Sequence, residues 1–504
     1  MQQAAPSPLP FSLKLWIPIL LYAFVGLAGI LHHEMWRDEL EHWLLARDST
    51  ELTDLVRNLR QEGHPAAWHL ILFGVSRFTQ NPLAMQLLHL GIAGGSAFFF
   101  LRYAPFPYLY RLLFCFGYFM SYEYAIISRA YGLGALCCWL YCAYYPFRYL
   151  SLIFLAFVLA VSANTSVYGT ILAVICLSVF LIDGAFLHRD ELRRLPLLRI
   201  VSSACILTAG LAFALRSMVP DVDPVPWHLS LSIDRVGIAL SGLWKAYFPV
   251  PDLFRIEFWN SNIVPHQALR AVLGGALLML GCLYFARKPV ILFGYAAGSC
   301  GLLLFSYTVY VGYLRHQGHL FILATMCLWL STYYQPVQVS GRILGRILDF
   351  SASVGKVVIT IILVAQVFAG IYALAMEFKY DFSAAKRATD LVKAHAAEGY
   401  AIGVLPNYFH SAVGYLSQPV FFPIANRIGT LGIYDDRFYS EADCSTLVQR
   451  LAVEMRRRNV KKLWLISNEP FNCRTSLLSI QQITAIERTI EKKERAYVYQ
   501  ITFP

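Results

Sequence analysis

Hydrophobic runs recur along the first three quarters of the chain, and short polar segments separate them. A membrane-spanning helix needs about 20 apolar residues, because each residue adds about 1.5 Å of rise and the hydrocarbon core is about 30 Å thick. The pattern therefore predicts about eleven spans and a polytopic α-helical membrane protein. The spans with clear limits are expected near 15–33, 83–101, 112–121, 131–145, 197–217 and 353–376, and the other five lie in the intervals between these.

The polar segment after the first span, about 34–82, contains one further apolar run, from His64 to about Phe78. This run is too short to cross a membrane and carries polar residues. It predicts a helix that lies in the membrane interface, within a first outer loop.

Lysine and arginine positions give the orientation. Lys14 precedes the first span, and later basic clusters such as 193–194 and 287–288 fall on the same side as Lys14 if the 64–78 run does not cross. Because cytoplasmic loop ends are enriched in lysine and arginine, the N-terminus is expected in the cytoplasm and the segment after the last span outside. The membrane is expected to be the plasma membrane, which is the inner membrane in a bacterium.

From about Lys379 the pattern changes to that of a soluble domain. The stretches 400–404 and 462–466 predict buried strands, and 445–457 predicts an amphipathic helix. Strands and helices that alternate in this way indicate a small α/β domain. The chain is thus expected to divide into a membrane module over 1–377 and an outer α/β domain over 378–504.

Composition supports this division and removes some functions. With 57% hydrophobic and 14% charged residues, the chain is not a soluble globular protein. The formal charge of +11 is spread in small groups between apolar runs, so membrane lipids are expected as partners and nucleic acid is not. Two of the eleven cysteines, Cys444 and Cys473, lie in the polar C-terminal part and could pair if that part faces an oxidising compartment.

A dense charged stretch, from His33 to Trp43, follows directly on the first span. It contains Arg37, Asp38 and Glu39. Charged groups at the mouth of a span are costly if drawn into hydrocarbon, so they often mark a site. The two acids could provide a general base or hold a divalent metal. The alternative is a capped interfacial helix with acids in its first turn, where the helix dipole favours them.

A second polar cluster, Arg315 to His319, is expected on the same outer face. Arg315 is the type of residue that contacts phosphate. His316 and His319 could ligate a metal, although histidines three residues apart are also common as hydrogen-bonded interfacial residues. Tryptophans of the loop over 220–266 fit an interfacial aromatic belt better than a sugar-stacking platform; these are Trp227, Trp244 and Trp259.

Four short motifs over about residues 14–150 carry a resemblance in their order and spacing. They are Trp36-Arg37-Asp38-Glu39, His64-Pro65, Glu123, and Ser128-Arg129-Ala130-Tyr131. Together with the first spans they resemble the N-terminal module of the GT-C superfamily of membrane glycosyltransferases, which includes the protein O-mannosyltransferases and the lipid A aminoarabinose transferase.

The resemblance implies roles for individual residues. Asp38 is expected to be the catalytic base and Glu39 its helper. Glu123, with Arg129, is expected to bind the donor phosphate or a metal, Mg²⁺ or Mn²⁺. Glu123 also lies six residues before Arg129 and could simply pair with it. The substrate cavity is expected to include Arg37, His64 and Tyr131, and His64 has the alternative of a hydrogen-bonded interfacial histidine.

The expected function is an inverting glycosyltransferase that moves a sugar from a polyprenyl-phosphate-linked donor to a glycan, lipid or protein acceptor on the outer face. Arg315, His316 and His319 are expected on the donor phosphate. The alternative is a polytopic transporter or flippase, in which the same charges form a substrate pathway near the middle of the membrane.

Overall fold

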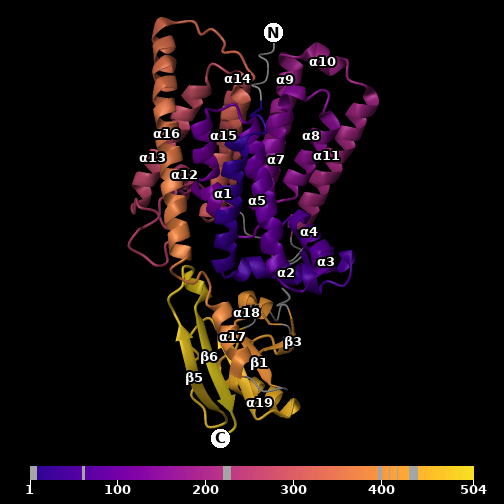
Figure 1. Ribbon diagram of the computed structural model, residues 1–504, viewed down its shortest axis with the longest axis vertical. Coiled ribbons are helices and arrows are strands. Elements are labelled where there is room, and N and C mark those ends of the chain that lie inside the picture. The colour runs from indigo at the N-terminus through magenta and orange to yellow at the C-terminus, as the bar shows by residue number, and fades with distance from the viewer. Residues whose placement is uncertain are drawn as a thin grey trace.

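A computed structural model describes residues 8–59, 63–219, 229–395, 400–407, 409–416, 418–430 and 441–504. Helices from α1 to α16 form one body, and the strands lie with α17, α18 and α19 in a second body at the C-terminal end of the chain (Figure 1). All of the described strands follow residue 400, in the part of the chain where the change in sequence pattern predicts a domain with strands.

Seven helices of the described chain are long and apolar enough to cross a membrane, so the fold is that of a polytopic helical membrane protein with a C-terminal sheet domain. Where small residues occur, these helices approach closely, as is common inside membranes. A Cβ atom at Gly26 would overlap Leu90, and one at Gly29 would overlap Ile126. The seven are α1 (Leu13–His32), α5 (Leu83–Tyr103), α9 (Val167–Phe186), α11 (Leu197–Met218), α13 (Gln267–Phe285), α14 (Pro289–Thr308) and α16 (Arg342–Glu377).

The other four predicted spans are also helices, but they do not reach that length or apolar character. α15 contains the polar cluster of Arg315 to His319 in its first turns, which lowers its hydropathy. The third predicted span is interrupted, because a π-helical turn, η1 (Phe119–Glu123), follows α6. The four helices are α6 (Tyr108–Cys115), α7 (Tyr131–Tyr144), α8 (Leu152–Ala163) and α15 (Leu314–Ser331).

The segment between the first two long helices, predicted to be an outer loop, is helical and lies at the end of the bundle that faces the C-terminal domain (Figure 1). Its helices are α2 (Arg37–Asp48), α3 (Leu52–Leu59) and α4 (Ala67–Ser76), so the short helix predicted after His64 is present. The loop predicted over 220–266 also contains a helix, α12 (Ile233–Tyr247), which the pattern did not predict. Two short turns complete the bundle, η2 (Tyr145–Phe147) and α10 (Arg189–Arg193).

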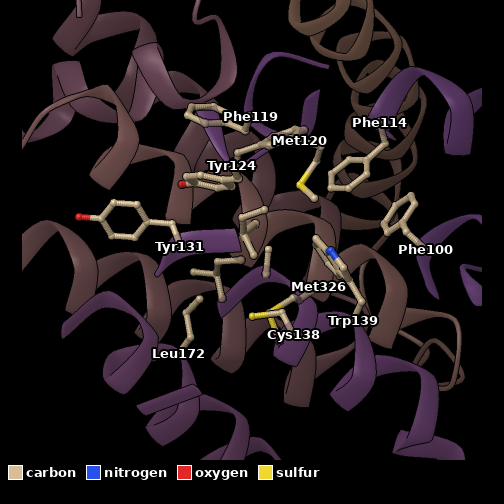
Figure 2. Packing of buried hydrophobic residues seen from close by; sticks show 14 of the residues in the cluster. Phe100, Phe114, Phe119, Met120, Tyr124, Tyr131, Cys138, Trp139, Leu172 and Met326 are labelled. Atoms are coloured by element: carbon tan, nitrogen blue, oxygen red, sulfur yellow. The ribbon is translucent and has the colours of Figure 1, made fainter. Parts of the chain in front are cut away.

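Aromatic and aliphatic side chains fill the middle of the bundle (Figure 2). Phe100 of α5 stacks on Phe114 of α6 with ring centroids 3.9 Å apart, and Trp139 of α7 meets Phe100 edge-on at 5.1 Å. Phe119 of η1 lies 6.0 Å from Phe321 of α15. This packing fixes η1 and α15 against each other. Glu123 lies at the end of η1, and Arg315 lies in the first turn of α15.

The C-terminal domain is a six-stranded mixed sheet with the order β3-β2-β1-β4-β6-β5. β1 is parallel to β2 and β4, and the other pairs are antiparallel. The two predicted strands and the predicted helix are confirmed as β1, β4 and α19. The elements are α17 (Ala385–His395), β1 (Ala401–Leu405), α18 (His410–Gly414), β2 (Val420–Phe422), β3 (Arg427–Gly429), α19 (Cys444–Arg457), β4 (Lys462–Ser467), β5 (Ser479–Ile486), η3 (Lys492–Glu494) and β6 (Ala496–Thr502).

Alternation along β1 gives the sheet two buried faces. Ile402 and Val404 pack with the α17 and α18 side, whereas Ala401 and Leu405 pack with the α19 side. A period of two residues places neighbouring side chains on opposite faces, which is why a nearly continuous apolar strand predicts burial on both. The sequence left open whether Cys444 pairs with Cys473, and in the structure the two form a disulfide that joins the start of α19 to the segment before β5.

Candidate functional site

The C-terminal domain contacts the start of α2. The Met35 N–H donates to the Tyr415 hydroxyl at 2.7 Å, and the Arg37 N–H donates to the Glu494 carboxylate at 3.2 Å. Leu40 lies directly against Gly414 of α18, where a Cβ would meet it at 2.8 Å. The first turn of α2, which carries Asp38, is thus fixed between the bundle and the sheet domain.

Three arginines surround the Asp38 carboxylate. Its Oδ2 atom lies 2.7 Å from Arg129 Nη1 and 3.1 Å from Arg315 Nη2, and its Oδ1 atom lies 3.2 Å from Arg37 Nε. Burial would raise the pKa of Asp38, but the charges of Arg129, Arg37 and Arg315 outweigh it and hold that pKa well below its usual range. The cluster thus brings three guanidinium groups to one carboxylate, and guanidinium groups are also the side chains that bind phosphate oxygens.

Arg315 is held by aromatic rings. Its guanidinium carbon lies 5.0 Å from the Trp36 ring, 5.2 Å from the Trp259 ring and 4.9 Å from the Tyr313 ring. Its side chain is 5% exposed, and its Nε and Nη1 atoms are buried without a hydrogen-bond partner within the described chain. Arg315 therefore has N–H groups beside Asp38 that could donate hydrogen bonds to an anionic ligand.

Arg129 is oriented by the loop before α4. Its Nη2 atom donates to His64 Nε2 at 3.2 Å, and the His42 ring lies 5.7 Å from the His64 ring. His64 thus touches the cluster through Arg129. The alternative that Arg129 pairs with Glu123 is wrong, because Arg129 pairs with Asp38 instead.

Glu123 sits at the end of the π turn and is oriented by aromatic donors. Its Oε2 atom accepts from the Tyr118 hydroxyl at 2.7 Å and from Trp259 Nε1 at 3.0 Å. The interpretation of Trp259 as part of an interfacial belt is wrong, since it is buried between Glu123 and Arg315. Trp244 stacks on Phe248, and Trp227 lies outside the described residues.

Glu39 belongs to a different network from Asp38. Both nitrogens of His33 face carboxylates at 2.8 Å, Nε2 toward Glu39 and Nδ1 toward Glu377. Glu39 also accepts from the backbone N–H of Ser128 at 2.6 Å and of Trp36 at 3.2 Å. Glu39 is fully buried and engaged on both oxygens, so it positions the segment before Arg129 and the first turn of α2.

His316 and His319 are buried in aromatic packing at the start of α15. His316 Nδ1 accepts from the Tyr313 N–H at 2.8 Å, and His319 Nδ1 donates to the His316 carbonyl at 3.0 Å. The Tyr168 ring stacks on both imidazoles, with centroids 5.2 and 4.9 Å away, and Tyr131 meets both edge-on. Tyr131 is therefore a packing partner of the two histidines.

A divalent metal does not fit the residues that the structure describes. They contain no group of three or more His, Cys, Asp or Glu side chains arranged to hold one. Three arginines already neutralise Asp38, and their charge would repel a dication. Mg²⁺ or Mn²⁺ stays a prediction of the resemblance, and no step below depends on it.

Glu494 gives a pH prediction for the contact between the two domains. Burial raises its pKa from 4.5 to about 7, while its Oε2 atom accepts from the Ser383 hydroxyl at 2.7 Å. A raised carboxyl pKa contributes stability that is present below about pH 4.5 and is lost as the pH rises through about 7. Glu494→Gln should therefore raise the thermal unfolding temperature at pH 8 and change it little at pH 5.

The control for that prediction is Glu469→Gln, which removes an exposed carboxylate from the same domain. It should shift unfolding equally at both pH values, as measured by differential scanning fluorimetry of the whole chain. Equal shifts for Glu494→Gln at pH 5 and pH 8 would contradict the prediction.

No protein-family model matches this chain, and no curated protein matches it. The function is therefore argued from the site. The structure brings together Asp38, Arg129 and Arg315, which the sequence analysis proposes as site residues, and adds Trp36 and Trp259, to which it gave no role at the site. Glu377, which pairs with His33 in the neighbouring network, was not singled out.

Proposed function

We propose that the protein is an inverting glycosyltransferase that takes a sugar from a polyprenyl-phosphate donor and transfers it to an acceptor on the outer face of the membrane. The observation that carries the proposal is the convergence of Arg129 and Arg315 on Asp38, from three separate segments, at one end of an apolar helical bundle. The site thus holds a carboxylate, which can serve as a proton acceptor, next to guanidinium groups, which can neutralise a phosphate that leaves.

A lipid-linked donor accounts for the bundle as well as for the cluster. An apolar pocket between α6, α13, α15 and α16 has a cavity volume of about 100 Å³, and its lining includes none of the residues of the Asp38 cluster. Its lining includes Phe114, Leu277, Phe321 and Ile359, the type of surface that an isoprenoid tail needs. Gly281 and Gly355 also line it, and the rings of Tyr295 and Tyr284 pack directly against these two glycines.

In the proposed reaction the acceptor hydroxyl attacks the anomeric carbon from the face opposite the phosphate. Asp38 takes the hydroxyl proton, the new carbon–oxygen bond forms, and the bond to the phosphate oxygen breaks with inversion. Arg315 and Arg129 neutralise the phosphate that leaves. Glu39 acts here as a positioning residue, through the backbone N–H groups of Ser128 and Trp36.

The proposed topology places the site and the C-terminal domain outside. The positive-inside rule supports it, as does a disulfide between Cys444 and Cys473, because disulfides persist in oxidising compartments. The plasma membrane, the bacterial inner membrane, is the proposed location.

A transporter or flippase is the weaker proposal. The charges of the cluster gather at one end of the bundle, next to the C-terminal domain, whereas the middle is packed with rings such as Phe100, Phe114 and Trp139 (Figure 2). A substrate pathway would need polar groups near the midplane.

The test uses purified whole protein in lipid vesicles with polyprenyl-phosphate-linked sugars and envelope extract as acceptor. We expect release of polyprenyl phosphate and a glycosylated product of inverted configuration, both detected by mass spectrometry. Movement of the lipid-linked sugar across the vesicle without any covalent change would favour the flippase. Comparison of envelope glycans from cells with and without the protein would then identify the acceptor.

A further inference from the structure

Two guanidinium groups converge on a single oxygen of Asp38. Arg129 and Arg315 come from different elements and reach the same Oδ2 atom at 2.7 and 3.1 Å. We propose that these two arginines are the binding site for the donor phosphate and that Asp38 is an internal anion which the phosphate displaces. The proposal rests on the proposed function and adds that the base becomes free only when the donor is bound.

Both arginines are held in place by neighbouring side chains, and Arg315 has more N–H donors than Asp38 uses. Arg315 lies between the rings of Trp36 and Trp259, and no hydrogen-bond partner of its buried Nε and Nη1 atoms is found among the residues that the structure describes. Arg129 is held by His64 and is 4% exposed. A phosphate group has several oxygens, so it can accept two hydrogen bonds from one guanidinium group. The Oδ2 atom of Asp38 instead lies close to one nitrogen of each arginine.

Asp38 is the partner that can move. Its side chain is 16% exposed, whereas those of Arg129 and Arg315 are 4% and 5% exposed. Its other oxygen faces Arg37, whose side chain is 30% exposed. If phosphate takes the two buried arginines, Asp38 keeps one solvent-facing cation and stays beside the reacting sugar.

Displacement changes what Asp38 can do. A carboxylate held by three guanidinium groups is a poor proton acceptor, because each cation stabilises its charged form. With two of the three engaged by phosphate, it accepts a proton from the acceptor hydroxyl more readily. The reaction is then ordered, with donor before acceptor.

The experiment measures binding of a short-chain polyprenyl phosphate, without sugar, to the whole protein in detergent by isothermal titration calorimetry. Asp38→Asn should bind it at least about tenfold more tightly than the wild type, because the competing anion is gone and all of the site is available. Arg129→Gln and Arg315→Gln should bind it at least about tenfold more weakly.

The control is Asp252→Asn, which removes the same charge from an aspartate that pairs with Arg255 on the outer loop. Its affinity should equal that of the wild type. Tighter binding cannot result from misfolding. The Asp38→Asn measurement therefore decides whether the phosphate displaces Asp38 from the two arginines. Unchanged or weaker binding by this variant overturns the displacement.

Other outcomes separate this inference from the proposed function. Binding of inorganic phosphate as tight as that of polyprenyl phosphate, still strengthened by Asp38→Asn, would support displacement and overturn the lipid-linked donor. A wild type and variants that all fail to bind either probe would overturn both.

Discussion

Asp38→Asn should lower the rate of sugar transfer from a polyprenyl-phosphate donor by at least about a thousandfold. Asparagine keeps the size of the side chain and can still accept from Arg129 or Arg315, but its amide cannot take a proton from the acceptor hydroxyl. Positioned general bases typically contribute about 10²- to 10⁴-fold, and the effect should appear in kcat because the base acts in the chemical step. The measurement is the initial rate of polyprenyl phosphate release.

Two controls belong with this prediction. Asp252→Asn removes an outer-loop carboxylate that pairs with Arg255 and should transfer sugar at the wild-type rate. Thermal unfolding of Asp38→Asn must show a folded protein, since the change leaves three arginines facing a neutral group. A folded Asp38→Asn protein that transfers sugar at the wild-type rate would refute the assignment of Asp38 as the base.

Local patterns in the sequence carry much of this fold. Apolar runs predict helices, and each of the eleven predicted spans overlaps a helix, although the third is divided between α6 and the π turn η1. Strands β1 and β4 and helix α19 follow from periodicity in the same way. Length and hydropathy support seven spans. One predicted span that does not meet the hydropathy criterion is α15, because polar residues from Arg315 to His319 occupy its first turns.

Only part of the site could be predicted from local sequence patterns. Asp38 and Arg315 are charged residues beside apolar spans. The sequence therefore predicts that both belong to a site and that they lie on the same face of the membrane. Glu377 was not predicted, although an acid at the end of an apolar span is the signal that could have found it. Its partner His33 lies 344 positions away, and only tertiary packing brings them together.

The position of Trp259 also depends on tertiary packing that the local sequence does not reveal. A tryptophan in an outer loop most often lies in the interface, but this one packs on Arg315 and donates to Glu123. Nothing in the neighbouring residues distinguishes the two cases. Glu39 adjoins Asp38 in sequence, yet successive positions of a helix point in different directions, and its side chain enters the His33 network instead.

Loss of the charge on His33 should have the largest effect on stability. Its ring lies between the carboxylates of Glu39 and Glu377, both nitrogens within 2.8 Å, and all three side chains are buried. Both contacts require protonated nitrogens, so the ring is an imidazolium that balances the two acids. Removing one partner of a buried ion pair typically costs about 3–5 kcal/mol, because the charge left behind is neither paired nor hydrated. His33→Leu should therefore lower the thermal unfolding temperature more than any surface substitution.

The neighbouring residue supplies the control for His33→Leu, and the acids supply the rescue. His32→Leu removes an exposed histidine one position earlier and should change stability little. Adding Glu39→Gln and Glu377→Gln to His33→Leu removes the uncompensated charge and should recover part of the loss in differential scanning fluorimetry. Because Glu39 also holds the Ser128 N–H, which precedes Arg129, the rescued protein should remain slow in sugar transfer. Recovery of stability and full activity together would show that the network does not position Arg129.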